Sequence, residues 1–171
     1  MEFFKYIVLS KVFPHDWCNR MIALMDKETN GAEAMDIGND RYLRYDFLNK
    51  ELAKEIHRYL QQYIDVSKFK VSHRFYMNKY WPESSYIGLH SDGHITDSHG
   101  YKSVYTILIY LNKCKGGTTN IILNDRIQVE VEVEPDIGKV LILDQNTTHE
   151  GLPPTETFKY VLRSDLMISN V

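Results

Sequence analysis

The spacing of hydrophobic residues changes near Asp65. Before this point, two segments place apolar side chains every three to four residues, which is typical of amphipathic helices. After it, short apolar segments are separated by turn-forming residues, which indicates β-strands. The pattern predicts an α+β chain in which two helices precede a mainly β region.

The first helix is expected to begin at Phe13-Pro14-His15-Asp16, with Asp16 near its N-terminal cap. A second helix is expected over 49–63, and a first strand over 3–9. The segment 29–40 is rich in Gly, Asn and Asp and is expected to be a loop. His57 lies outside the apolar stripe of the second helix and is expected to be exposed. The two stripes consist of Cys18, Met21, Ile22 and Met25, and of Leu52, Ile56, Tyr59, Leu60 and Tyr63.

The β region predicts antiparallel strands that form a barrel or sandwich, with the helices packed on one outer side. One strand, 126–134, alternates four apolar residues with Gln128 and three glutamates. Its acidic row is interpreted as a solvated face rather than a docking surface. The expected strands cover 71–81, 86–90, 103–112, 118–123, 126–134, 139–144 and 158–169.

Composition adds bounds on size and partners. A length of 171 residues suits a single domain, with 1–68 as mainly helical support and 69–171 as the barrel core. A net charge of −3 gives no support to a nucleic-acid partner. The chain has no apolar run long enough for a signal peptide or a membrane span, so a cytoplasmic location is expected. Cys18 and Cys114 are expected to be free thiols.

Candidate chemistry begins with His90 and Asp92, two residues apart at the end of an expected strand. Side chains at positions i and i+2 of a strand leave the same face, so an imidazole and a carboxylate can converge on one point. A distant histidine, His149, follows a second buried-looking strand. Two histidines and one carboxylate on one side of a metal form the facial triad of non-haem Fe(II) oxygenases. No histidine pair has zinc-finger spacing with cysteines.

Seven ordered blocks extend this signal over roughly 71–168. With them, the C-terminal half resembles the prolyl 4-hydroxylase group of Fe(II)/2-oxoglutarate-dependent dioxygenases. The blocks are Arg74-Phe-Tyr-Met-Asn-Lys-Tyr80, His90-Ser-Asp92-Gly, Tyr105-Thr-Ile-Leu-Ile-Tyr-Leu-Asn112, Gly116-Gly-Thr-Thr119, Gly138-Lys-Val-Leu-Ile-Leu-Asp144, His149-Glu-Gly151 and Lys159-Tyr-Val-Leu-Arg-Ser-Asp-Leu-Met167.

The resemblance implies a double-stranded β-helix, a jelly-roll or cupin-like barrel. It also implies Fe(II) held by His90, Asp92 and His149, with 2-oxoglutarate and O2 as cosubstrates and ascorbate as a candidate reductant. The family's basic anchor for 2-oxoglutarate falls on Lys159 and its tyrosine helper on Tyr80. Tyr110 and Thr119 are implied as further cosubstrate contacts.

Several of these residues also fit other roles in the structure. Tyr80 also fits an aromatic core residue with a solvated hydroxyl, and Lys159 a solvated strand residue. Arg163 shares the face of Lys159 and is assigned to substrate, to the near carboxylate of the cosubstrate, or to an ion pair with Asp165 or another carboxylate. His94 and His99 are interpreted as lid or substrate-contact residues, because the metal already has three ligands.

The expected function is hydroxylation of a C–H bond in a peptidyl residue such as proline, or in a small amino-acid-like molecule, with release of succinate and CO2. Two alternatives remain, an oxidative nucleic-acid demethylase and a non-catalytic metal-binding barrel. Relatives with demethylase activity carry paired arginines after the distal histidine, whereas this chain has Lys159 and Arg163.

Overall fold

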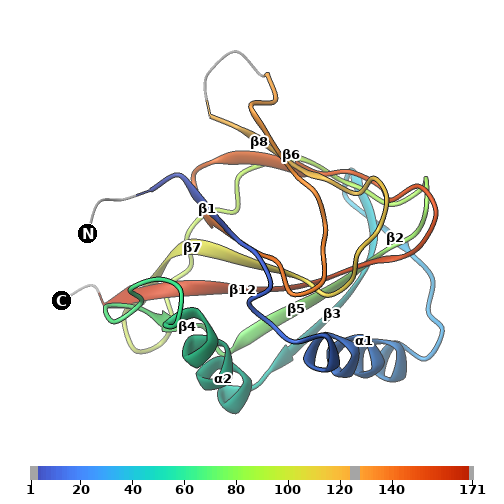
Figure 1. The fold of residues 1–171 in the computed structure, drawn as a ribbon. Coiled ribbons are helices and arrows are strands. Elements are labelled where there is room, and N and C mark those ends of the chain that lie inside the picture. The colour runs from blue at the N-terminus through green and yellow to red at the C-terminus, as the bar shows by residue number, and fades with distance from the viewer. Residues whose placement is uncertain (1–3, 124–127, 170–171) are drawn as a thin grey trace.

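Two antiparallel sheets face each other, and both helices cover the outer side of the larger sheet (Figure 1). The computed structural model describes residues 4–123 and 128–169. The eight-stranded sheet has the order β1-β10-β7-β12-β5-β3-β2, with β4 also paired to β12, and the four-stranded sheet has the order β6-β11-β8-β9. The sheets do not close into a barrel, but the predicted α+β architecture with helices on one side is confirmed.

The elements follow the chain in the order β1 (Tyr6–Leu9), α1 (His15–Thr29), β2 (Met35–Ile37), β3 (Asp40–Leu48), α2 (Lys50–Leu60), β4 (Lys70–Val71), β5 (Arg74–Tyr80), β6 (Ile87–His90), β7 (Tyr101–Tyr110), β8 (Thr119–Ile122), β9 (Val131–Val133), β10 (Val140–Asp144), β11 (Thr148–Gly151) and β12 (Lys159–Ser169).

Both predicted helices form. Pro14 is the N-cap residue of α1, and the Asn49 side chain caps α2 by accepting a hydrogen bond of 2.9 Å from the Leu52 amide. His57 is half-buried rather than exposed, because its ring nitrogen hydrogen-bonds the carbonyls of Val66 and Phe69. In the described residues, no helix is long and apolar enough to cross a membrane.

The expected loop over 29–40 is wrong at its end. Residues 35–37 form β2, which pairs with β3 as a hairpin at the edge of the larger sheet. The predicted strand over 126–134 is shorter than expected, since only Val131–Val133 pair with β8. Val129, expected inside, is 36% exposed, and Ile127 lies outside the described residues.

The larger sheet is buried on both faces, so alternate residues of one strand enter different cores. In β10, Ile142 packs toward the helices, whereas Leu141 and Leu143 point between the sheets. β12 does the same with Leu162 and Val161. The space between the sheets is therefore lined by every second residue of the central strands, and the candidate site lies there.

Candidate active site

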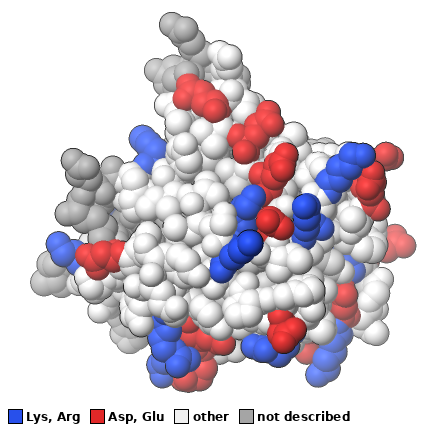
Figure 2. All heavy atoms as spheres, viewed as in Figure 1, with Lys and Arg blue, Asp and Glu red and all other residues white. Residues whose placement is uncertain are grey.

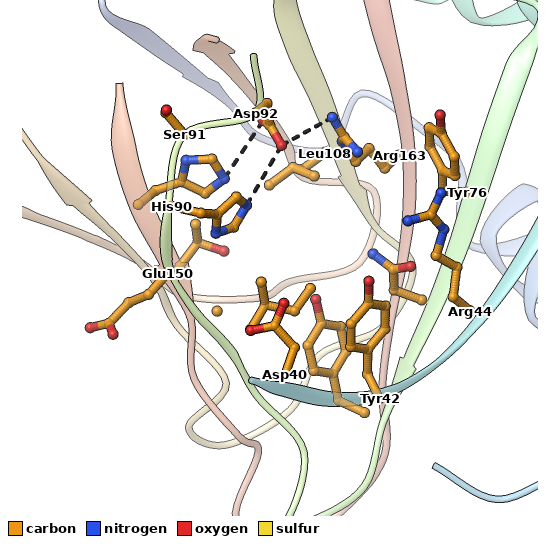
Figure 3. A pocket seen from close by; sticks show the side chains of 16 residues that line it. Asp40, Tyr42, Arg44, Tyr76, His90, Ser91, Asp92, Leu108, Glu150 and Arg163 are labelled. Atoms are coloured by element: carbon orange, nitrogen blue, oxygen red, sulfur yellow. Dashed lines mark ion pairs between the residues drawn. The ribbon is translucent and has the colours of Figure 1, made fainter. Parts of the chain in front are cut away.

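His90, Asp92 and His149 converge as the sequence predicts. β6 and β11 are adjacent antiparallel strands with His90 opposite His149, and Asp92 follows β6 by two residues. His90 Nε2 lies 3.6 Å from one oxygen of Asp92, and His149 Nε2 lies 3.7 Å from the other. One ligand atom from each residue lies within 4.8 Å of the other two. The three residues form one cluster, and Figure 3 shows His90 and Asp92 side by side at the cavity.

Backbone carbonyls fix both imidazole rings. His90 Nδ1 lies 2.7 Å from the Gly88 carbonyl, and His149 Nδ1 lies 3.0 Å from the Thr147 carbonyl. A ring nitrogen next to a carbonyl oxygen carries the proton, which leaves both Nε2 lone pairs facing the cluster. Burial also lowers the pKa of His149, so this imidazole is neutral and ready to bind a metal.

Asp92 is held as a carboxylate. Its side chain is 5% exposed, which by itself raises the pKa, but the neighbouring His90 ring, the charge of Arg163 and a 2.5 Å hydrogen bond from Thr106 lower the pKa well below the usual range. Arg163 Nη2 lies 3.0 Å from Asp92 Oδ1. Of the alternatives for Arg163, the ion pair with a carboxylate is the one found, and its main partner is Asp92 rather than Asp165 at 3.7 Å.

The donor set fits a divalent metal. Ligand bonds of about 2.1 Å place neighbouring ligands of one metal roughly 3 Å apart, slightly closer than the observed distances. A small rotation of Asp92 would close that difference, and two histidines with one carboxylate would hold a metal while leaving its other positions to exchangeable ligands.

Lys159 lies at the other end of the same space. It begins β12 opposite Tyr80 of β5, and its side chain is 1% exposed. Its ammonium donates to the Gly117 carbonyl at 2.8 Å and lies 4.2 Å from the centre of the Tyr80 ring. Burial lowers the pKa of Lys159 to about 7. The solvated alternative for Lys159 is therefore wrong.

Tyr80, Tyr110 and Thr119 surround this end. Tyr80 is 4% exposed, while Tyr110 is fully buried and donates to Thr119 Oγ1 at 2.7 Å. Because Thr119 accepts from Tyr110, its own hydroxyl proton is available to an acceptor in the cavity. Tyr80 and Thr119 line that cavity, whereas Tyr110 and Lys159 lie behind it.

The cavity has a volume of about 250 Å3 (Figure 3). Its lining is partly polar and partly apolar and includes His90, Asp92 and His149. β3, which was not predicted from the sequence, contributes Asp40, Tyr42 and Arg44 to the cavity wall. These three residues occupy alternate positions in the sequence, which is the spacing of one strand face, but two of them are charged and so do not mark an apolar strand. His94 and His99 are exposed and do not line the cavity.

The sequence profile of the 2OG-Fe(II) oxygenase superfamily matches residues 70–164, which is more than half of the chain. The chain belongs to the 2OG-Fe(II) oxygenase superfamily. The oxygenase is thus an enzyme that uses Fe(II), 2-oxoglutarate and O2. A search of curated protein sequences gave no match.

Solved structures support the same fold. The viral collagen prolyl hydroxylase from Paramecium bursaria Chlorella virus-1, solved with 2-oxoglutarate, has a TM-score of 0.72 at 16% identity, covering 96% of this chain and 97% of that one. A Pseudomonas putida prolyl-4-hydroxylase has a TM-score of 0.66 at 17% identity, covering 98% of this chain and 94% of that one. A Trichoplax adhaerens prolyl hydroxylase bound to a hypoxia inducible factor peptide has a TM-score of 0.65 at 15% identity, covering 96% of this chain and 84% of that one. The predicted double-stranded β-helix is confirmed.

Gly117 lies directly against the Lys159 side chain. Its φ is +69°, and a Cβ there would lie 3.0 Å from Lys159 Cδ and 3.2 Å from Cys114 Sγ. We expect Gly117→Ala to raise the KM for 2-oxoglutarate about tenfold, as loss of one charge-assisted hydrogen bond predicts, with a smaller effect on kcat. Steady-state kinetics with varied 2-oxoglutarate measure this.

The matched control is Gly31→Ala, which has a similar φ of +75° but nothing within 4 Å of the added Cβ. Both variants carry backbone strain of about 1–2 kcal/mol, so both should melt earlier. An equal rise in KM in both would mean that Gly117 acts through general destabilisation.

Proposed function

We propose that this oxygenase hydroxylates a C–H bond of a peptidyl residue or of a small amino-acid-like molecule, releasing succinate and CO2. The observation that carries the proposal is the convergence of His90, Asp92 and His149 on one side of a polar cavity. In this proposal they are the ligands of Fe(II). The bound metal supplies O2 reduction coupled to oxidative decarboxylation of 2-oxoglutarate.

The protein's own groups bind and orient the cosubstrate. The distal carboxylate of 2-oxoglutarate needs a cation and hydrogen-bond donors, because burying an unpaired carboxylate is very costly. We assign Lys159 as that cation and the Tyr80 and Thr119 hydroxyls as donors. Tyr110 supports Thr119 through their 2.7 Å hydrogen bond rather than lining the cavity.

Arg163 is assigned to hold Asp92 in place, in keeping with their 3.0 Å contact. Arg163 on Oδ1 and Thr106 on Oδ2 would hold the Asp92 carboxylate toward the two histidines, where it would bind the metal together with them. A contact between Arg163 and substrate is not part of the proposal.

The affinity for 2-oxoglutarate should depend on pH. The pKa of Lys159 is lowered to about 7, and the doubly charged cosubstrate binds the protonated amine. We therefore expect a flat KM for 2-oxoglutarate below about pH 7 and a rise of up to about tenfold per pH unit above it. Kinetics from pH 6 to 9 measure this. A KM that falls as the pH rises would contradict the assignment.

The proposed substrate is not a nucleic acid. Basic and acidic side chains are intermixed among the described residues on the face in Figure 2, with no continuous basic stripe there, and the net charge is −3. We further propose that the 171 residues form one catalytic domain and that it works in the cytoplasm, where its two buried, unpaired thiols stay reduced.

The test is a two-part assay. Labelled 2-oxoglutarate is incubated with enzyme, Fe(II) and ascorbate to measure conversion to succinate, and peptides and amino acids are then screened for the mass gain of one oxygen atom. Conversion to succinate with a matching mass gain supports the proposal. Absence of both, for all substrates, would favour a metal-binding barrel without turnover.

A further inference from the structure

Two carboxylates at the cavity have no cation. Asp40 Oδ1 accepts a 2.8 Å hydrogen bond from the Gly88 amide, and Glu150 Oε1 accepts one of 2.9 Å from Asn120 Nδ2. Both residues line the cavity, and no Lys, Arg or His in the described part of the chain forms an ion pair with either. Figure 3 shows the Asp40 carboxylate facing the open space.

The two arginines that line the cavity are already paired. Arg44 makes a two-point contact with Asp46, at 2.6 and 3.0 Å, and Arg163 pairs with Asp92. Neither arginine pairs with Asp40, and the ammonium of Lys159 donates to the Gly117 carbonyl instead.

A buried acceptor lies in the same wall. Asn78 is 6% exposed, and its Oδ1 has no hydrogen-bond partner. An unpaired buried acceptor costs about 1–3 kcal/mol, so a donor from a ligand would be favourable here.

We propose that the substrate brings a positively charged nitrogen, an ammonium or guanidinium group, to Asp40, with Asn78 Oδ1 accepting a further N–H. The inference rests on the proposed function and narrows its substrate class to amines. The source is either a free amino acid or the basic side chain of a peptide, which present the same chemistry. A neutral residue such as an internal peptidyl proline would leave Asp40 without a cation and Asn78 Oδ1 without a donor.

Binding of matched cationic and neutral probes tests this. The free amino acid arm compares L-proline with N-acetyl-L-proline, and the peptide arm compares capped lysyl and arginyl peptides with capped acetyl-lysyl and prolyl peptides. NMR titrations use the full chain with Zn(II), which carries no redox chemistry, and 2-oxoglutarate. In at least one arm, the cationic member should bind roughly 10- to 100-fold tighter. Equal or weaker binding of the cationic probes in both arms, or no binding by any of them, overturns the proposal.

The decisive variant is Asp40→Asn, which keeps the shape and the acceptor for Gly88. Asp40→Asn should lower the affinity for the favoured cationic probe roughly 10- to 100-fold and leave the affinity for the matched neutral probe unchanged. The control is Asp36→Asn on the neighbouring strand, where an exposed Asp36 pairs with Arg41 away from the cavity. Asp36→Asn should still bind the cationic probe more tightly than the neutral one. Unchanged affinity in a folded Asp40→Asn protein, or equal losses in both variants, contradicts the assignment.

The titrations involve no turnover, so the two proposals fail separately. Lack of 2-oxoglutarate conversion with a clear preference for cationic probes would count against the proposed hydroxylation alone. Conversion without that preference would count against the amine site alone.

Discussion

Replacing His149 with alanine is expected to abolish Fe(II)-dependent conversion of 2-oxoglutarate to succinate. His149 supplies one of three metal ligands, its ring is 4% exposed and its Nε2 faces Asp92. Outer partners of metal ligands typically contribute 10- to 100-fold in metal affinity or activity. Loss of a ligand should therefore lower turnover by more than about 100-fold. A succinate assay, together with iron content measured after equilibration, checks both effects.

His15→Ala is the control, because His15 is an exposed histidine at the start of α1, on the helical side of the larger sheet. It should behave as wild type. If the His149 variant keeps wild-type turnover and binds one iron per chain, His149 is not a ligand and the metal centre must lie elsewhere.

Removing the charge of Lys159 is expected to raise the KM for 2-oxoglutarate by at least about 100-fold, since truncating one partner of a buried ion pair costs about 3–5 kcal/mol. Lys159→Ala tests this, and Lys159→Met keeps most of the side-chain volume while removing the charge. Steady-state kinetics and calorimetric binding of 2-oxoglutarate to the Zn(II) protein measure the loss.

Melting temperature separates binding from folding in these variants. Burial lowers the pKa of Lys159 to about 7, so the folded state disfavours the protonated form, and Lys159 costs stability at neutral and lower pH. The Met variant should therefore melt at the wild-type temperature or above it. A stable Met variant with unchanged KM would contradict the anchor role.

The sequence predicted the site residues whose spacing puts their side chains on one side of a local segment. The spacing of His90 and Asp92 predicted their convergence although β6 ends at His90, and alternation predicted that Lys159, Val161 and Arg163 share one face of β12. His149 was a candidate third ligand because it follows a buried-looking strand, but the residues alone could not place it beside β6, because contacts between distant strands depend on sheet order. β11 and β6 pair across nearly sixty residues of chain.

The strand that contributes Asp40 was not predicted. Helices cover one face of β3 and the polar cavity adjoins the other, so Tyr42 and Leu43 are both buried. The sequence does carry a strand signal here, because Leu43, Tyr45 and Phe47 alternate with the more polar Tyr42, Arg44 and Asp46. The sequence around 29–40 has the Gly and Asn content of a loop, and the β2–β3 hairpin forms because β3 pairs with β5.

The most direct test of the metal centre is a crystal structure of the protein with Mn(II) and 2-oxoglutarate, with the metal located by anomalous scattering. We predict one metal about 2.2 Å from Nε2 of His90, Nε2 of His149 and one carboxylate oxygen of Asp92, with the far carboxylate of 2-oxoglutarate on Lys159. A metal bound at other residues, or none between these three side chains, would contradict the account.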